Sequence, residues 1–288
     1  MLRLLLLPVL ALAGVLALTA RLGASRWEKA TRDLLARLDA GRSPVEPTRF
    51  DPSELDGLPA PVGRCLRAVL REGQPLVTAV EIDHAGTFDM GRVRPSWKPY
   101  TSRQRAVTRR PGFVWSARMP MAPGLPVRVH DAYVAGEGIL TAALWGLVPV
   151  ADLRGTPDLA QGELMRYLAE TAWYPTALLP SQGVRWEAVD DGSARATLTD
   201  GGTTVTLLFR FGEDGLVLSV HAEDRGRSVG KASVPTPWEG RWSGYEERDG
   251  MMVPTEGEVG WILPEGWKPY WRGRIVGLRY EYPPPKRL

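Results

Sequence analysis

Three charged side chains recur at helical spacing in the middle of the chain. Glu163, Arg166 and Glu170 stand at positions i, i+3 and i+7, so they share one face of a helix. An exposed row of ion pairs is the simplest interpretation. If the helix instead fills the mouth of a curved sheet, Arg166 could bind an anionic head group, or the two carboxyl groups could exchange protons with a substrate.

The three histidines lie far apart and offer little catalytic chemistry. His130 and Asp131 are the best acid–base pair, but neighbouring residues of a strand point to opposite faces and form no dyad without a bulge. The sequence contains no nucleophile-elbow serine, no His-Glu-x-x-His zinc motif and no complete dinucleotide glycine motif. We therefore expect no cofactor and no metal, and keep an enzyme that uses His130 or the charged helix face as an alternative.

Tryptophan is the most frequent aromatic residue, with 11 copies against 8 tyrosines and 5 phenylalanines. A curved sheet that is lined by such rings and incompletely filled leaves an apolar pocket, which suits acyl chains and similar ligands. Rings that only fill a core, or that form a partner surface, are the alternatives. The predicted ligand-binding residues are Trp115, Tyr133, Trp145, Arg166, Glu170, Trp173, Leu178, Leu179 and Trp186.

Elements that could position these residues follow from the period of the apolar pattern. From residue 76 onward apolar and polar residues alternate, which is typical of half-buried strands, and the alternation is clearest over 184–222. About ten antiparallel strands with one apolar face must curl, because strand twist accumulates. The other predicted strands are 77–88, 106–110, 113–118, 127–134, 139–147, 238–247, 251–263 and 271–282.

One helix interrupts these strands. Thr156 is its expected N-cap, Pro157 takes the first helical position, and residues 158–172 continue it. We expect this helix on the concave side of the sheet. The apolar segments 119–126 and 175–180 are broken by proline, so we expect loops that pack into the core or form a pocket rim.

The first residues predict an association with a membrane. Residues 4–20 form a run of 17 uncharged residues, at the short limit of what spans a bilayer, and we favour an uncleaved anchor over a signal peptide. The leucine-rich start is typical of export, which favours an extracytoplasmic location, whereas the basic residues that follow favour the opposite orientation.

The boundaries that follow are 1–24 for the signal peptide or anchor, 25–57 for an amphipathic helix and a proline-rich linker, and 58–288 for the curved β domain. The apolar residues of the amphipathic helix, including Trp27 and Leu34, predict that it lies at the membrane surface. Cys65, the only cysteine, lies in the apolar stripe of a second helix, where a small buried residue is a simpler interpretation than a reactive thiol.

The amino-acid composition restricts the classes of protein that are possible. Apolar residues make up 44% of the chain and charged residues 24%, which is ordinary for a folded globular protein. The net charge of +3 comes from basic residues scattered among 33 acidic ones, and this pattern gives no indication of nucleic-acid binding.

Several short motifs together resemble a bacterial family of unknown function over roughly residues 58–288. They are the RYLAE sequence at 166–170, PTALLP at 175–180, Trp186, PGFVW at 111–115 and Asp-Ala-Tyr at 131–133. The resemblance implies no reaction. It implies an architecture similar to the LolA-like lipoprotein-carrier fold, a curved half-barrel with helices inside that shields acyl chains, and such a likeness of fold assigns no function.

The sequence thus predicts a mainly β (α+β) protein: a large curved antiparallel sheet or half-barrel with one interrupting helix, preceded by N-terminal helices and a membrane segment. We predict that the protein is tethered to a membrane through residues 4–20, lies outside the cytoplasm, and binds a lipid or another amphiphilic ligand without catalysis. An uncharacterised enzyme with the same cavity, and a structural or partner-docking scaffold, are the alternatives.

Overall fold

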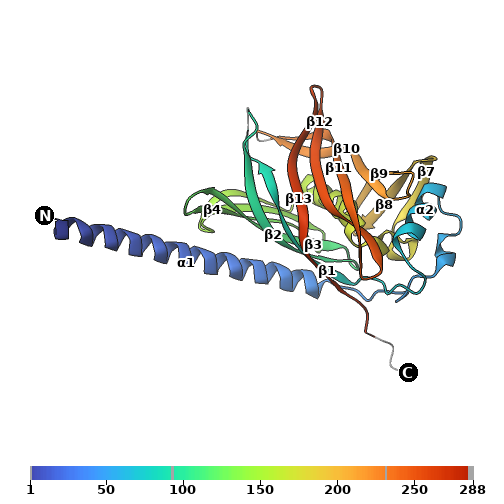
Figure 1. The fold of residues 1–288 in the computed structure, drawn as a ribbon, viewed down its shortest axis with the longest axis horizontal. Coiled ribbons are helices and arrows are strands. Elements are labelled where there is room, and N and C mark those ends of the chain that lie inside the picture. Colours follow the sequence, from blue (N-terminus) through green and yellow to red (C-terminus); the bar gives the residue numbers. More distant parts are fainter. Residues whose placement is uncertain (1, 92–93, 231, 285–288) are drawn as a thin grey trace.

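The computed structural model of the protein describes residues 2–91, 94–230 and 232–284, and the side chains of residues 2–13 and 16 lie outside that description. Within these ranges 13 strands form one antiparallel sheet that curves around an apolar interior (Figure 1). This confirms the predicted mainly β architecture. The strands are β1 (Ala79–Asp89), β2 (Trp97–Val107), β3 (Gly112–Ala122), β4 (Leu125–Val134), β5 (Glu137–Leu144), β6 (Val148–Arg154), β7 (Arg185–Asp190), β8 (Ser193–Asp200), β9 (Thr203–Phe211), β10 (Val217–Val229), β11 (Ala232–Arg248), β12 (Met251–Leu263) and β13 (Gly266–Glu281).

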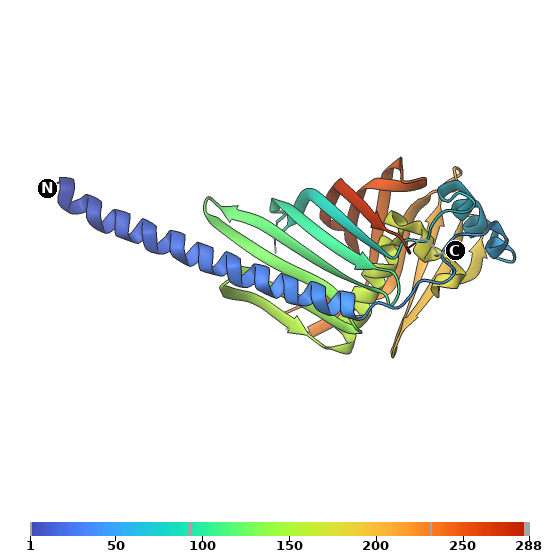
Figure 2. The same cartoon turned by 90° about the horizontal axis from the view of Figure 1, so that it is seen from below.

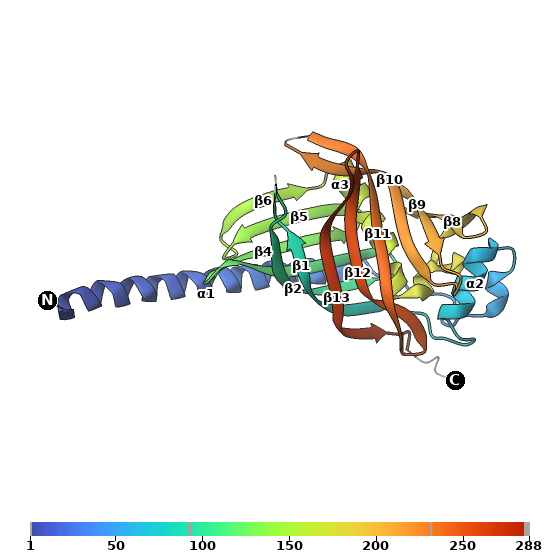
Figure 3. The ribbon, with the colours of Figure 1, turned by 45° about the horizontal axis from the view of Figure 1, so that its top comes forward.

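The path of the chain explains why a helix interrupts the strands. Strands β1 to β6 add one after another toward one edge of the sheet, and β7 to β13 return from the opposite edge, so that β13 pairs with β1. Between β6 and β7 the chain must cross from edge to edge. The helix α3 (Pro157–Glu170) makes this crossing on the concave side (Figure 3), followed by the 3-10 turns η2 (Thr171–Trp173), η3 (Pro175–Leu178) and η4 (Pro180–Gln182).

The ends and the buried face of α3 follow the predicted signals. The hydroxyl oxygen of Thr156 accepts a hydrogen bond from the Leu159 amide, which caps the first turn, and Pro157 occupies the first helical position. Leu164 and Leu168 are fully buried against the sheet. The helix therefore contributes to the core as well as connecting the two edges.

A second, smaller core lies on the convex face of the sheet. The long helix α1 (Leu2–Ala40) packs its C-terminal half along β2, β3 and β4 (Figure 2), and Leu34 and Leu38 are buried there against apolar residues such as Val114. The apolar residues from which we predicted a membrane-surface helix pack on the protein itself. The apolar stripe of α1 faces the sheet, because the outward positions of these strands are themselves apolar and need covering.

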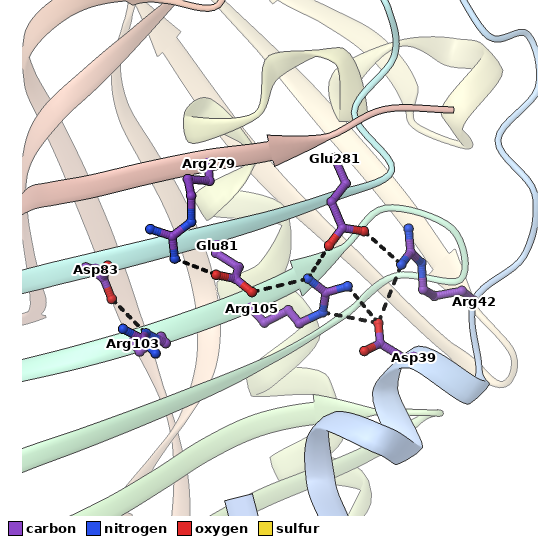
Figure 4. Close-up of polar contacts among 8 residues, drawn as sticks. All are labelled: Asp39, Arg42, Glu81, Asp83, Arg103, Arg105, Arg279 and Glu281. Atoms are coloured by element: carbon purple, nitrogen blue, oxygen red, sulfur yellow. Dashed lines mark hydrogen bonds and ion pairs between the residues drawn. The ribbon is translucent and has the colours of Figure 1, made fainter. Parts of the chain in front are cut away.

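Ion pairs hold the C-terminal end of α1 to the same face (Figure 4). Arg105 on β2 lies 2.9 Å from the carboxylate of Asp39 at the end of α1 and 2.6 Å from that of Glu281 on β13. Arg42 bridges the same two carboxylates, at 3.6 and 3.0 Å. Residues from the start and the end of the described chain thus meet in one network.

The predicted membrane segment receives no support from the described residues. The side chains of residues 4–13 and 16, which make up most of that segment, lie outside the description. In the part of the chain that is described, no helix has both the length and the apolar character needed to cross a membrane.

The remaining helices surround one end of the sheet. The short 3-10 helix η1 (Pro52–Leu55) precedes α2 (Ala60–Val69), which packs on β8 and β12. Cys65 is fully buried in α2, and burial raises the pKa of its thiol to about 12. A structural role for this cysteine, rather than a reactive thiol, agrees with that environment.

Three strand predictions were wrong. Residues 106–110 are not a strand of their own: 106 and 107 end β2, which begins at Trp97, and 108–110 form the turn to β3. Residues 119–126 are not a loop: they form the ends of β3 and β4 and the turn between them, where Pro120 pairs with Pro126 close to the tip and interrupts few ladder bonds. Residues 139–147 are not one strand, because Trp145 and Gly146 turn the chain into β6. Trp145 has a φ of 55°, a conformation that an aromatic residue rarely adopts and that its sequence does not signal.

Candidate ligand-binding cavity

The concave side of the sheet is not completely filled. A cavity of about 400 Å³ lies between α3, strands β3 to β6 on one side, and strands β10 to β13 on the other. This volume lies within the range of small-molecule sites. Eight of the residues that line it are aromatic: Phe88, Trp115, Trp173, Trp238, Trp242, Trp261, Tyr270 and Trp271.

The aromatic rings that line the cavity contact one another, and a glycine on a neighbouring strand leaves room for one of them. Trp173, at the end of η2, meets Trp242 edge to face at a centroid distance of 5.0 Å. Trp242 fits because residue 257 on β12 is glycine: a methyl group there would lie 2.6 Å from the indole ring. Within the described residues, the indole N–H groups of Trp115, Trp173 and Trp242 are buried without a hydrogen-bond acceptor.

Arg166 of α3 lies at the floor of the cavity, and its hydrogen-bonding capacity is largely used. Its Nη1 donates to Asp131 on β4, its Nε donates to Glu170 at 2.7 Å, and its Nη2 donates to Gln104 on β2 at 3.3 Å. Burial alone would lower the pKa of Arg166, but the negative charges of Glu170 and Asp131 raise it above the ordinary value. Arg166 is therefore a permanent cation that is already neutralised by protein carboxylates.

A second guanidinium, that of Arg225, faces the cavity from β10. Its Nη2 lies 3.5 Å from the carboxylate of Glu163, and its central carbon lies 4.8 Å from the ring centre of Trp238. The side chain is only 9% exposed. Its Nη1 is buried and has no acceptor within the described residues. Arg225 is thus held in place by one long ion pair and one aromatic ring, and its Nη1 group is left without an acceptor.

A β-bulge aims Arg225 into the cavity. Val220 and Ala222 of β10 face the interior, so regular alternation would send residue 224 inward and Arg225 outward. The pairing of β10 with β11 shifts register between Ala222 and Arg225, which reverses the phase. Bulges of this kind commonly redirect a side chain toward a functional site.

Glu163 is the most strongly perturbed carboxyl group of the cavity. Burial is the main cause that raises its pKa well above the ordinary value, followed by the negative charge of Asp131, and the charges of Arg225 and Arg166 offset only part of this. Glu163 therefore retains a proton more readily than an isolated glutamate does.

His84, on β1, is buried beside this wall. Its ring lies 4.9 Å from that of Trp173, and neither of its nitrogens has a partner within the described residues. Burial, and secondly the charge of Arg166, lower its pKa to about 3. His84 is therefore neutral at physiological pH and acts as a packing residue rather than as a charged group.

The structure brings together four of the nine sequence-predicted binding residues, which are Trp115, Arg166, Glu170 and Trp173. The other five do not line the cavity. Trp145 lies in the β5–β6 turn, where its indole donates to the Gly124 carbonyl at 2.5 Å. The remaining four pack elsewhere in the core: Tyr133 donates to Asp200 at 2.9 Å, Trp186 donates to the carbonyl of Leu178 at 2.9 Å, and Leu178 and Leu179 are buried in and just after η3.

The catalytic alternative based on His130 is not supported by geometry. His130 lies on the convex face, stacked at 4.1 Å against Trp27 of α1 and 2.7 Å from the Thr31 hydroxyl, whereas Asp131 points into the cavity. The predicted opposite orientation of these neighbours is confirmed. Within the described ranges, no cluster of three or more histidine, cysteine or acidic side chains is arranged to hold a metal ion.

Comparison with known families identifies the chain at the level of its family. The model of the DUF6920 family, described as a family of unknown function, matches residues 56–280. The chain belongs to the DUF6920 family. The matched part runs from just after η1 to β13, so every residue that lines the cavity of this DUF6920 chain lies inside it, and α1 lies outside it. The resemblance to a family of unknown function is thereby confirmed.

Comparison with solved structures finds matches that include three bacterial proteins. A LolA superfamily protein from Nitrosomonas europaea is 12% identical, with 78% of this chain and 94% of that chain covered and a TM-score of 0.40. A putative outer membrane lipoprotein-sorting protein domain from Vibrio parahaemolyticus is 11% identical (70% and 85% covered, TM-score 0.39). A DUF1329 family protein from Desulfovibrio piger is 13% identical (81% and 94% covered, TM-score 0.39). A comparison of the DUF6920 chain with curated proteins found no match.

Proposed function

We propose that this protein binds a hydrophobic or amphiphilic molecule, such as a lipid, in the concave cavity and leaves it chemically unchanged. The observation that carries the proposal is the unfilled space of about 400 Å³ walled by six tryptophans. Removal of an apolar tail from water into such a space is favourable by about 25 cal/mol per Å² of buried apolar surface.

Native mass spectrometry of detergent-free protein tests the proposal directly. A bound lipid-sized mass that disappears on denaturation is the expected result. Titration of the emptied protein with N-phenyl-1-naphthylamine, a fluorescent apolar probe, is expected to give saturable binding with quenching of tryptophan emission. A protein that carries no ligand and binds no probe would contradict the proposal and favour a scaffold.

A cavity-filling variant locates the binding. Val259 lines the cavity from β12, whereas Val276 of β13 is 58% exposed on the convex face, so Val259→Trp and Val276→Trp form a matched pair. We expect Val259→Trp to weaken probe binding at least tenfold and Val276→Trp to leave it unchanged. Equal effects of the two variants would place the probe elsewhere.

Acid–base catalysis in the same cavity is a second candidate, favoured by the carboxyl pair of Asp131 and Glu163. A raised carboxyl pKa beside a cavity is the arrangement that a general acid needs. The two functions differ in the fate of the ligand. Recovery of the co-purified molecule with an unchanged mass after prolonged incubation supports binding alone, whereas a product that the Glu163→Gln variant does not form supports catalysis.

The membrane tether and the extracytoplasmic location remain proposals that stand on the sequence of residues 4–20. We expect the full chain to sediment with membranes and to resist extraction by salt. An alkaline-phosphatase fusion at the C-terminus is expected to be active. A soluble chain, or an inactive fusion, would contradict the tether or the location, respectively.

A further inference from the structure

The polar groups of the cavity are not equally available to a ligand. All three guanidinium nitrogens of Arg166 donate to protein acceptors, so the residue first expected to anchor a head group is already satisfied. In Arg225 only Nη2 approaches a carboxylate, at 3.5 Å, which is long for an N–H···O hydrogen bond. Arg227 also lines the cavity from β10, but it is only half-buried and donates to the Thr236 hydroxyl at 3.4 Å. The available buried cation is therefore Arg225.

The two buried guanidinium groups of the cavity differ in their counter-charges. Arg166 lies between two carboxylates, those of Asp131 and Glu170. Arg225 approaches a single carboxyl group, that of Glu163, and only at 3.5 Å. A buried guanidinium that is incompletely paired is costly, and an anionic ligand would reduce that cost.

Most of the unpaired atoms around the cavity are donors. Within the described residues, the buried polar atoms of the cavity lining that have no partner are Nη1 of Arg225, the indole nitrogens of Trp115, Trp173 and Trp242, and one carboxyl oxygen each of Asp131 and Glu163. The four nitrogens can only donate, so a ligand that satisfies them must bring acceptor oxygens.

We propose that Arg225 binds the acidic head group of an amphiphilic ligand, a carboxylate or a phosphate ester, while the tryptophan wall holds its apolar tail. This inference rests on the proposed function and specifies its ligand class. The ring of Trp238 beneath the guanidinium keeps one face of Arg225 dry and leaves its edge free for the head group, and charge-assisted hydrogen bonds of this kind are among the stronger ones in proteins.

Four probes with the same twelve-carbon tail separate the head groups: dodecanoic acid, dodecyl phosphate, dodecanol and dodecylamine. Their affinities for the emptied full-length protein are compared by competition with N-phenyl-1-naphthylamine at pH 7.5 and concentrations below micelle formation. We expect at least one acid to bind at least tenfold more tightly than the alcohol, and the amine to bind most weakly. The ranking of the two acids distinguishes a carboxylate ligand from a phosphate ligand.

Variants assign the preference to Arg225. We expect Arg225→Met to lose the acid preference while it keeps the affinity for dodecanol, and Arg225→Lys to keep part of the preference. Arg241→Met is the matched control, because Arg241 lies on the neighbouring strand β11 and stacks on Trp267 outside the cavity. It is expected to bind all four probes as the unmodified protein does.

The outcomes are distinct for the two proposals. If acid and alcohol bind equally to the unmodified protein, or if the amine binds best, the head-group inference is overturned and the proposed function stands. If no probe binds, the proposed function itself fails. The probe ranking needs no substitution, so the inference stays testable even if Arg225→Met does not fold.

Discussion

At the scale of single residues, the cavity is defined by which polar groups are satisfied and which are not. Arg166 and Glu170 share a network with Asp131 and Gln104, so they are the structural floor of the site. Arg225 and Glu163 face each other at a longer distance and retain unpaired atoms. Residues with unmet hydrogen-bonding capacity in a cavity are better candidates for ligand contact than residues that the fold already uses.

Glu163 is expected to make stability depend on pH. Because its pKa is raised in the folded state, mainly by burial, the unfolded chain loses the proton first as the pH rises above about 4.5. The folded state then loses up to about 1.4 kcal/mol per pH unit until the folded pKa is reached. We expect Glu163→Gln to be more stable than the unmodified protein by a margin that grows between pH 5 and pH 7.5, measured by urea unfolding of ligand-free protein.

The exposed Glu213, in the turn between β9 and β10, provides the control for this prediction. Glu213→Gln is unfolded at the same pH values, so that the effect of burial at Glu163 can be separated from that of the substitution itself. A Glu163→Gln margin that stays constant or shrinks as the pH rises would mean that Glu163 is ionised in the folded protein.

The sequence located part of this site and not the rest, for identifiable reasons. Helical spacing alone placed Glu163, Arg166 and Glu170 on one face. The simplest interpretation, an exposed row of ion pairs, was wrong, because Glu163 and Glu170 are buried and all three residues line the cavity. Arg225 could not be found in this way, because its inward orientation depends on a bulge that alternation does not announce. Leu178 and Trp186 lie in the same core, but they contact each other and do not line the cavity. No local sequence pattern distinguishes residues that pack in a core from residues that line a cavity.

At the scale of elements, the position of α3 depends on a close approach to β5. A methyl group at Gly138 of β5 would lie 2.6 Å from the backbone nitrogen of Ala160 and 2.6 Å from the carbonyl carbon of Leu159, both in the first turn of α3. Backbone atoms cannot move aside as a flexible side chain can. The glycine therefore sets how deeply the helix enters the concave side.

We expect Gly138→Ala to destabilise the protein by about 1–3 kcal/mol, the usual cost of overpacking. The variant should also weaken probe binding, because Leu159 and Glu163 of the displaced helix line the cavity. Urea unfolding and probe titration measure the two effects. Gly202→Ala, in the β8–β9 turn where the added methyl group meets nothing within 4 Å, is the control. Equal stability of the two variants would show that α3 adjusts freely.

Element prediction succeeded where local signals were complete. The cap, the initial proline and the apolar stripe predicted α3, and turn residues predicted β7 to β9 and β12. The prediction ended one strand at 222 and began the next at 238, so it missed the hairpin end of β10 and β11, where Arg225 lies. It failed at β6, because Trp145 adopts a turn conformation that favours glycine, and at the β3–β4 hairpin, because its prolines suggested a loop. The position of α1 on the convex face could not be predicted from a local pattern either, since an amphipathic helix fits a sheet or a membrane equally well.

At the scale of the whole molecule, the fold is one sheet whose first and last strands pair, so the two ends of the described chain stabilise each other. The network on the convex face joins Asp39 of α1, Arg105 of β2 and Glu281 of β13 across this seam (Figure 4). The concave face, by contrast, keeps its cavity. The stability of the sheet is thus separated from the surface that we propose for ligand binding.

This separation predicts an acid-sensitive contribution to stability that does not involve the cavity. Hydrogen bonding to Arg105 is the main cause that lowers the pKa of Glu281, so its contribution is complete at neutral pH and is lost as the pH falls below about 4.5 toward the folded pKa. The Glu281 side chain is 46% exposed, and solvent screening limits the contribution to at most about 1 kcal/mol. We expect Glu281→Gln to be less stable than the unmodified protein at pH 7, to approach it in stability near pH 3, and to bind apolar probes unchanged. Urea unfolding at both pH values measures the difference in stability between Glu281→Gln and the unmodified protein. Glu265→Gln, in the β12–β13 turn, is the exposed control. A loss of stability in Glu281→Gln that persists at pH 3 would show that Glu281 stabilises the protein by packing and not by its charge.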